Sequence, residues 1–217
     1  MDQEVLIGLI ALAGAAWGFA ADRLAARWPA HEDGSIRRID WRTPIVVVVG
    51  GLAFAATVAT FGADSRALVV VGVYVVALVL LFATDLDQRL LPDVITLPLI
   101  ALAAIVLVSG QSVFIRTNED VLWAVGAAIL APAALYLLSI PFGQGAIGQG
   151  DLKLLVSVGL LAGSGKLFYA LIAGALLAGL TVGALLLVRR ISLKSFVPYG
   201  PFLIAGTMWA ILALPRP

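Results

Sequence analysis

Long apolar runs, separated by short polar stretches, constrain the fold of this chain more than any other feature of its sequence. They show neither the alternation of a half-buried strand nor the one-sided stripe of a surface helix, so they are typical of segments that face lipid. A backbone in hydrocarbon must satisfy its own hydrogen bonds, and we therefore expect each run to be helical. The eight runs cover residues 4–21, 44–61, 67–84, 94–109, 121–139, 152–163, 167–188 and 201–214.

This pattern predicts an all-α fold, a polytopic membrane helix bundle with about eight transmembrane segments. We expect a single membrane-embedded domain over residues 1–217, with one short cytoplasmic loop at 22–43 and no separate soluble domain. The runs 152–163 and 201–214 are shorter than the roughly 20 residues of a straight span. We expect these two segments to be tilted, broken or buried against neighbouring helices.

The composition excludes several classes of function. Only 12% of the 217 residues are charged, about half the fraction that is usual in a soluble domain. The absence of cysteine excludes disulfides, thiolate metal sites and cysteine nucleophiles. A net charge of +1 gives no indication of a nucleic-acid partner, and we expect neither a metal nor another cofactor. The first run has no basic region before it, so we expect a retained span and not a cleaved signal peptide.

The basic residues are distributed unevenly between the two sides of the predicted membrane. When the eight spans alternate, the 14 Lys and Arg residues divide ten to four between the two sets of loops. Cytoplasmic loops carry the excess of Lys and Arg. We therefore predict a multi-pass protein of the plasma (inner) membrane with both termini outside. The richer set, taken together with Lys153, comprises the loops 22–43, 85–93, 140–151 and 189–200.

Two of these cytoplasmic loops carry carboxylates next to apolar runs. Asp85, Asp87 and Asp93 lie between two spans, and Asp151 stands at the mouth of another. Ionisable groups near membrane depth are costly, which makes them candidates for function. Ordinary solvated charges at helix ends are an equally good explanation at this level, and Asp93 in particular could cap the helix that follows it.

Asp85 and Asp151 are the pair that we expect to work together. Asp85 ends a long apolar helix, and Asp151 follows Gly148-Gln149-Gly150, whose glycines allow another helix to press close. Two carboxylates in a partly dry site share one proton and titrate as a coupled pair. The ionised member can activate water while the protonated member polarises a peptide carbonyl. We interpret the single histidine, His31, as a surface residue.

The residues around both aspartates resemble a known family. The stretch from Asp85 to Asp93, DLDQRLLPD, looks like the first aspartate motif of the type IV prepilin peptidases, which are membrane aspartyl proteases of the GxGD class. The stretch from Gly148 to Lys153, GQGDLK, looks like their GxGDxK motif. Weaker similarities occur at Gly18–Asp22 and at Pro198–Phe202. The resemblance covers nearly the whole chain.

The resemblance implies an endopeptidase that removes the short basic leader of prepilins or pseudopilins, after a glycine, on the cytoplasmic side. By position, Asp85 and Asp151 take the catalytic places. Asp87 and Asp93 would attract the basic leader, or are solvated spectators. Lys153 would tune Asp151, or anchor its helix at the interface. Within the two motifs, we expect Gly148, Gly150 and Pro92 to have a structural role.

Two departures from the family pattern put a second activity in doubt. Many members also methylate the new N-terminus and carry a cytoplasmic loop with two CxxC pairs that hold zinc. Here the corresponding loop is short and has no cysteine, so a thiolate zinc site is impossible. Phe19 and Asp22 also stand where the family usually has Ser and Asn. We therefore expect a short form of the family in which methyl transfer is doubtful.

Two other functions remain open on sequence alone. One is a GxGD protease of another sort, which cuts substrate helices inside the bilayer; Pro92 and the number of spans favour a prepilin peptidase instead. The other is a small transporter or assembly subunit, not an enzyme, whose aspartates relay protons. Intramembrane carboxylates agree with such a relay, but a relay does not predict the pairing of the two aspartate motifs.

Overall fold

A computed structural model describes residues 2–31, 34–142, 147–190 and 199–215, and the chain in these ranges is helical, with no strand. This confirms the predicted all-α class. The helices, in chain order, are α1 (Gln3–Ala25), α2 (Arg42–Phe61), α3 (Ser65–Gln88), α4 (Asp93–Val108), α5 (Asn118–Ser139), the short 3-10 helix η1 (Ile140–Phe142), α6 (Gln149–Leu187) and α7 (Gly200–Leu212).

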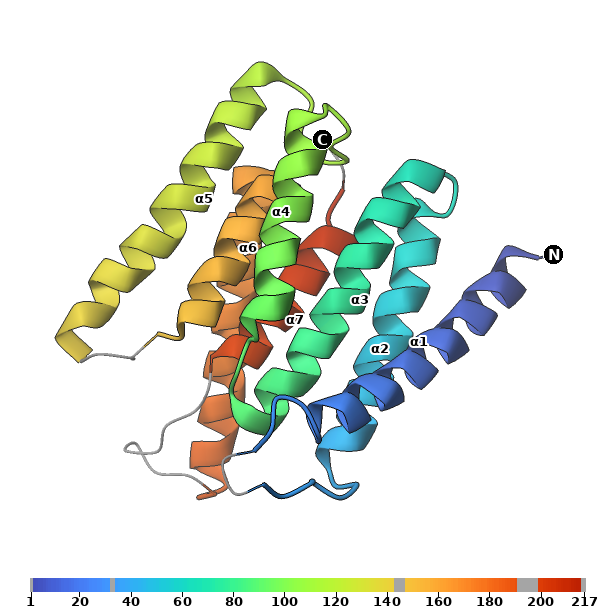
Figure 1. The fold of residues 1–217 in the computed structure, drawn as a ribbon, viewed down its shortest axis with the longest axis vertical. Helices are drawn as coiled ribbons and strands as arrows, with labels where there is room; N and C mark the ends of the chain where they lie inside the picture. The colour runs from blue at the N-terminus through green and yellow to red at the C-terminus, as the bar shows by residue number, and fades with distance from the viewer. Residues whose placement is uncertain (1, 32–33, 143–146, 191–198, 216–217) are drawn as a thin grey trace.

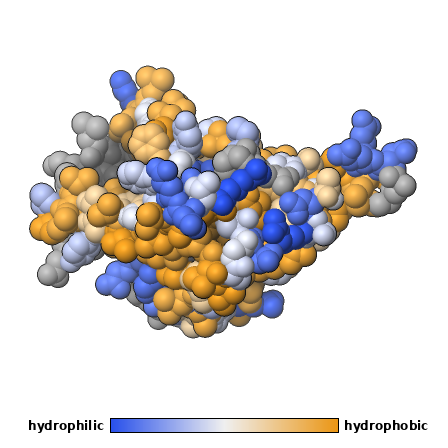
Figure 2. Space-filling model, turned by 90° about the horizontal axis from the view of Figure 1, so that it is seen from above, coloured by the Kyte–Doolittle hydropathy of each residue, from blue (hydrophilic) through white to orange (hydrophobic). Residues whose placement is uncertain are grey.

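Five of these helices are long and apolar enough to cross a membrane, namely α1, α2, α3, α5 and α6. Helices α4 and α7 are apolar but shorter. Large apolar side chains such as Leu12, Leu122 and Leu130 are exposed on the outside of the bundle. Figure 2 looks down on the upper end of the bundle, where hydrophilic and hydrophobic residues are mixed. Exposed apolar side chains along the helices suit contact with lipid.

Helix α6 contains the two predicted runs 152–163 and 167–188. Its backbone is broken at Gly163 (φ 81°, ψ 173°), and this break divides the helix into a first and a second limb. Near the start of α6, Asp151 Oδ1 lies 3.0 Å from where a Cβ on Gly200 would stand. Further along α6, a Cβ on Gly174 would lie 3.1 Å from the Cα of Leu203. Both positions therefore adjoin the first turn of α7, although a straight helix would separate them by about 35 Å. Figure 1 shows the two limbs of α6 running in opposite directions.

The centre of the bundle is formed by α3, the first limb of α6 and α7. Fully buried residues of these helices include Leu78, Leu154 and Ile204. A hydrogen bond of 2.7 Å between the buried hydroxyls of Tyr74 and Ser157 joins α3 to α6. The two runs that are too short for a straight span are thus broken and buried against neighbours, two of the arrangements expected for them.

Several helices, among them α1, α3 and α6, extend further into the charged sequence than predicted. Helix α1 continues through Asp22 and Arg23 to Ala25, so the connection to α2 is shorter than the expected loop 22–43. Asp85 and Asp87 lie in the last turn of α3, and Asp151 lies in the first turn of α6. The helices can include these charged residues because each one is buried, paired with an opposite charge or placed in a terminal turn, as described below.

The connections that follow α1 and α3 lie at the lower end of the bundle in Figure 1, together with the start and the end of α6. The turn after α2, the bend of α6 and the last residues of α7 lie towards the other end. This arrangement agrees with the predicted alternation of spans. The assignment of the lower end to the cytoplasm stays a prediction.

Candidate functional site

Asp85 occupies the last turn of α3 and is only 4% exposed. The preceding Thr84 is also fully buried. Arg89, the residue after α3, caps the helix: its backbone adopts the left-handed conformation (φ 58°) and its N–H donates to the carbonyl oxygen of Asp85 at 2.9 Å. The side-chain atom Oδ2 of Asp85 is buried and has no hydrogen-bond partner in the described part of the chain.

Asp151 is the third residue of α6, where a carboxylate can satisfy free amides of the first turn. The helix begins after Gly148, and the Asp151 carboxylate accepts a hydrogen bond from the backbone N–H of Gly148. This is half of a capping box, and the positive end of the helix dipole also stabilises a negative charge here. The other oxygen, Oδ1, is buried and unpaired among the residues that the structure covers.

Gly150 allows the first turn of α6 to press against the connection between α3 and α4. A Cβ on Gly150 would lie 2.5 Å from the Cβ and 3.0 Å from the carbonyl oxygen of Leu91. No larger residue fits this approach without a shift of backbone. Pro92, the next residue, precedes α4 and its carbonyl oxygen accepts the N–H groups of Ile95 and Thr96, each at 3.0 Å. The two sequence motifs are thus in direct contact.

Gly200, at the start of α7, brings the two aspartates to one point. A Cβ on Gly200 would overlap Asp85 Oδ2 and would lie 3.0 Å from Asp151 Oδ1. The two unpaired oxygens therefore face the same methyl-sized space. The backbone of Gly200 is not in the left-handed region, so what the site requires of this residue is the absence of a side chain. The structure brings Asp85 and Asp151 together, as the sequence predicts.

Tyr199, which precedes Gly200, adds a neutral donor beside the pair. Burial raises the pKa of its phenol, and the charge of the nearby Asp151 raises this pKa further. The phenol therefore keeps its proton, and its O–H donates to the carbonyl oxygen of Leu171 at 3.4 Å. Pro198, which belongs to the same sequence motif, lies outside the described residues.

Asp93 and Lys153 form an ion pair at the edge of the site, with a distance of 2.5 Å between Lys153 Nζ and Asp93 Oδ1. The pair links the first turns of α4 and α6. The Asp93 side chain is 61% exposed, so the pair contributes little to stability. Lys153 therefore reaches Asp93, and the atoms nearest to a Cβ on Gly200 belong instead to Asp85 and Asp151.

Asp87 lies in a different environment from the one that the sequence suggested. Its side chain is 2% exposed and hence not solvated. Asp87 Oδ1 lies 2.5 Å from Arg37 Nε and 3.2 Å from Arg42 Nη1, and Asp87 Oδ2 lies 3.1 Å from His31 Nε2. His31, expected at the surface, is thus partly buried against this carboxylate. Asp87 is held by cations of this chain itself.

The ion pairs around Asp87 belong to a group of charges that sequence reasoning missed. We call this group the loop cluster. Its three arginines and three aspartates balance in charge. All of them except Asp87 lie within residues 22–43, so the charges of both signs in this stretch were the available signal. The sequence analysis used these arginines for orientation only. The members of the loop cluster are Asp22, Arg23, Arg37, Asp40, Arg42 and Asp87.

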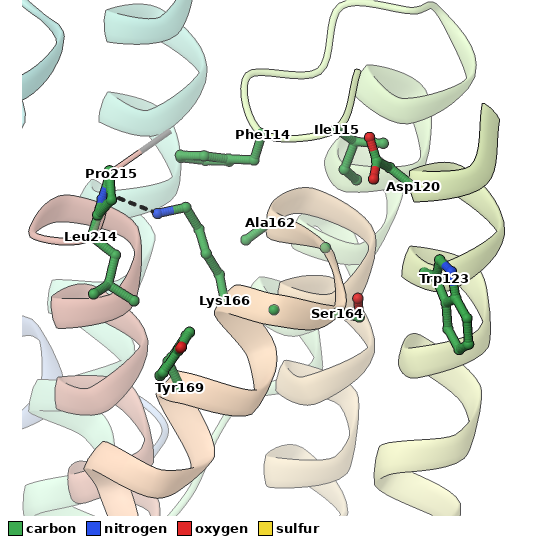
Figure 3. Close-up of a pocket in the computed structure, with 12 residues that line it drawn as sticks. Phe114, Ile115, Asp120, Trp123, Ala162, Ser164, Lys166, Tyr169, Leu214 and Pro215 are labelled. Atoms are coloured by element: carbon green, nitrogen blue, oxygen red, sulfur yellow. Dashed lines mark hydrogen bonds between the residues drawn. The ribbon is translucent and has the colours of Figure 1, made fainter. Parts of the chain in front are cut away.

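A separate pocket of about 530 Å³ lies at the opposite end of α7 (Figure 3). Its notable residue is Lys166, which is only 7% exposed. Lys166 Nζ donates to the carbonyl oxygens of Ala210 and Leu214 at 2.9 and 3.0 Å and lies 4.9 Å from the ring centre of Phe114. A lysine in this position caps the last turn of α7, so its evident role is structural.

In the parts of the chain that the structure describes, no group of three or more His, Asp or Glu side chains is placed to hold a metal ion. The arrangement at Gly200 instead offers acid–base chemistry. Two carboxylates with unpaired oxygens face one space, so one can hold a proton while the other accepts one from water.

These features define a class, that of polytopic helical membrane proteins with a paired-carboxylate site between helix ends. Comparison with known proteins narrows the class. The sequence profile of the type IV leader peptidase family matches residues 72–183, just over half of the chain, and this stretch contains both Asp85 and Asp151. The chain belongs to the type IV leader peptidase family, which confirms the resemblance seen in its motifs.

Curated relatives are 31–32% identical to this chain over the residues that align with it. A prepilin leader peptidase/N-methyltransferase of Burkholderia pseudomallei (strain 1026b) is 32% identical over 166 residues, which cover 76% of this chain and 52% of the relative. A protein of the same name from Pseudomonas putida is 32% identical over 81% of this chain and 60% of the relative. Another from Dickeya chrysanthemi is 31% identical over 80% and 61%. The chain thus spans about half to three fifths of the length of these relatives. No solved structure matches it.

Proposed function

We propose that this chain is an aspartic endopeptidase of the plasma (inner) membrane, which removes the short basic leader of prepilin-like proteins after a glycine, at the cytoplasmic face. The observation that carries the proposal is the meeting of Asp85 Oδ2 and Asp151 Oδ1 at Gly200. Family membership and the names of the relatives support prepilins as the substrate class.

The two aspartates have different surroundings, which suggests different roles. Asp151 accepts the Gly148 N–H at the start of α6, so its negative charge is stabilised and it is the better base. Asp85 is buried at the end of an apolar helix and is the better candidate for the protonated member. Helix α7 begins at Gly200, beside the shared space, and the positive end of its dipole favours negative charge there.

The reaction needs only these two groups and one water. Asp151 takes a proton from the water while the water oxygen attacks the carbonyl carbon of the scissile peptide. Asp85 gives its proton to the carbonyl oxygen, which becomes a hydroxyl of the tetrahedral intermediate. When the C–N bond breaks, the leaving amine takes the proton from Asp151, and the hydroxyl returns its proton to Asp85. Each proton transfer is an acid–base step between groups in contact.

The location of the pair suits the proposed substrate. A peptide bond between a basic leader and an apolar helix lies at a membrane interface, because the helix enters hydrocarbon and the leader stays in water. Asp85 is in the last turn of one apolar helix, and Asp151 is in the first turn of another. The pair is therefore at the end of the bundle, which supports a substrate bond at the membrane interface.

Cleavage of a prepilin with a glycine-ending basic leader, by the purified chain in liposomes, tests the proposal. Asp85→Asn and Asp151→Asn should each reduce cleavage by about 10²–10⁴-fold. The double variant should lose little more, because the pair acts as a unit. Asp93→Asn is a suitable control, since Asp93 is exposed and pairs with Lys153, and it should reduce cleavage at most in part.

Substantial cleavage by a well-folded Asp85→Asn or Asp151→Asn variant would contradict the proposal. Sequencing of the product separates the two kinds of protease, since a protease that cuts inside the bilayer would leave a new end within the apolar helix. Proton flux through liposomes without any cleavage would favour the proton-relay alternative.

A further inference from the structure

Arg37 is in contact with three carboxylates at once, although it lies in the connection between α1 and α2. Its Nη2 lies 2.5 Å from Asp22 Oδ1, its Nη1 2.7 Å from Asp40 Oδ1 and its Nε 2.5 Å from Asp87 Oδ1. The Arg37 side chain is 11% exposed. Burial alone would lower the pKa of its guanidinium, but the hydrogen bond with Asp22 and the charges of all three carboxylates raise this pKa above its ordinary value. Arg37 thus stays charged.

The carboxylates around Arg37 belong to different helices. Asp22 is in the last turn of α1 and also accepts the hydroxyl of Thr43, at the start of α2, at 2.8 Å. Asp87 is in the last turn of α3 and also contacts Arg42, the first residue of α2, at 3.2 Å. Arg37 therefore connects the ends of α1 and α3, and the rest of the loop cluster adds the start of α2.

This connection acts on the turn of α3 that carries Asp85. Asp87 is two residues after Asp85, and residues two apart lie on different sides of a helix. Asp85 can therefore face Gly200 while Asp87 faces Arg37. The next residue, Gln88, donates to the carbonyl oxygens of Ala25 and Pro29 at 3.3 and 2.7 Å. Without such ties the last turn of a helix frays, because its final carbonyls have no partner within the helix.

We propose that Arg37 is a positioning residue of the peptidase, which acts through Asp87 to hold the last turn of α3 so that Asp85 faces Asp151. This inference rests on the proposed function. It also gives Asp87 a different role from attraction of the basic leader, since the negative charge of Asp87 is already matched by Arg37 and Arg42. The two roles predict different kinetics. Loss of positioning lowers kcat, whereas loss of leader attraction raises KM.

The test uses the full chain in liposomes and two substrates, a prepilin with a basic leader and the same prepilin with its leader Lys and Arg residues replaced by Gln. The variants are Arg37→Gln, Arg37→Lys, Asp87→Asn and the double variant Arg37→Gln/Asp87→Asn. Arg38→Gln is the matched control, because Arg38 is the next residue along the chain and is exposed. Thermal unfolding establishes that each variant is folded. Hydrogen–deuterium exchange of residues 84–89 reports on the last turn of α3 independently of activity.

Arg37→Gln and Asp87→Asn should each lower kcat by about 10- to 10²-fold, the cost of misplacing a reactive group by roughly 1 Å, with KM changed by less than about threefold. The double variant should be no slower than the slower single variant, because both break one connection. Arg37→Lys should recover part of kcat, since it keeps the charge but not the three-way contact. Exchange at residues 84–89 should rise in Arg37→Gln and stay unchanged in Arg38→Gln. Both substrates should respond alike.

A folded Arg37→Gln variant with unchanged kcat and unchanged exchange would overturn the inference. So would a loss that appears only in KM and disappears with the neutral-leader substrate, because that result would assign Asp87 to the leader. If every variant of Arg37 and Asp87 failed to fold, the loop cluster would be structural alone and the inference would be wrong. Failure of the unaltered chain to cleave either substrate would instead contradict the proposed function, and the exchange measurement would still decide on the role of Arg37.

Discussion

Gly200→Ala is the substitution that most directly tests the geometry of the site. The added Cβ would overlap Asp85 Oδ2 and would lie 2.8 Å from Asp85 Cγ and 3.0 Å from Asp151 Oδ1. Ordinary contacts of this kind are about 3.5–4.0 Å, so the carboxylates or the start of α7 must move by roughly 1 Å. The backbone of Gly200 is outside the left-handed region, and alanine adds no conformational strain of its own.

A displacement of about 1 Å in a reacting group costs about 10²-fold in rate. Overpacking of one methyl group costs about 1–3 kcal/mol in stability, which a bundle in liposomes or mild detergent should tolerate. We therefore expect Gly200→Ala to remain folded, to bind the prepilin substrate and to cleave it about 10²-fold more slowly. The assay is the initial rate of leader release over a range of substrate concentrations, accompanied by a thermal unfolding curve.

Gly179→Ala provides the matched control. Gly179 lies in the second limb of α6, and a Cβ there meets nothing within 4 Å, so both rate and stability should be unchanged. A folded Gly200→Ala variant with the full cleavage rate would refute the reasoning, since the space between the two carboxylates would then play no part in the reaction.

Three further predictions concern orientation, methyl transfer and stability. A cysteine introduced at Ser35, unique because the chain has none, should be labelled from the cytoplasmic side; labelling from outside would reverse the topology. Mass spectrometry of mature pilin, made with added S-adenosylmethionine, should show little or no added methyl group. The reason is that Asp22, at the position of the family's usual Asn, is already bound by Arg23, Arg37 and Thr43. High methyl occupancy would contradict this prediction. Lys166→Met should reduce the free energy of unfolding by about 2–3 kcal/mol, since the carbonyls of Ala210 and Leu214 lose a charged donor. An unchanged unfolding curve would show that this cap contributes nothing.

The sequence predicted the helical bundle well because hydrocarbon leaves the backbone few alternatives. It also selected Asp85 and Asp151 correctly as residues that meet, since each belongs to a motif whose order and spacing are specific. The helix ends were less predictable. A charged residue such as Asp22 was taken to end a span, but pairing with Arg23 and Arg37 lets α1 continue to Ala25.

Contacts between distant segments could not be predicted from one sequence. The Asp87 carboxylate was interpreted as available to substrate because its partners Arg37 and Arg42 are far away along the chain. Gly200 belonged to a recognised motif, but nothing in the sequence indicated that its missing side chain leaves room for two carboxylates. Gly163 was not singled out, although the break there explains why the run 152–163 is short.

The position of Gly200 has a consequence for biosynthesis. The space that Asp85 and Asp151 face is closed by α7, which leaves the ribosome after α1 to α6. A nascent chain that has inserted only α1 to α6 already holds both carboxylates but lacks the wall against which they are placed. For the proposed peptidase, cleavage activity would therefore appear only after the docking of this single short helix.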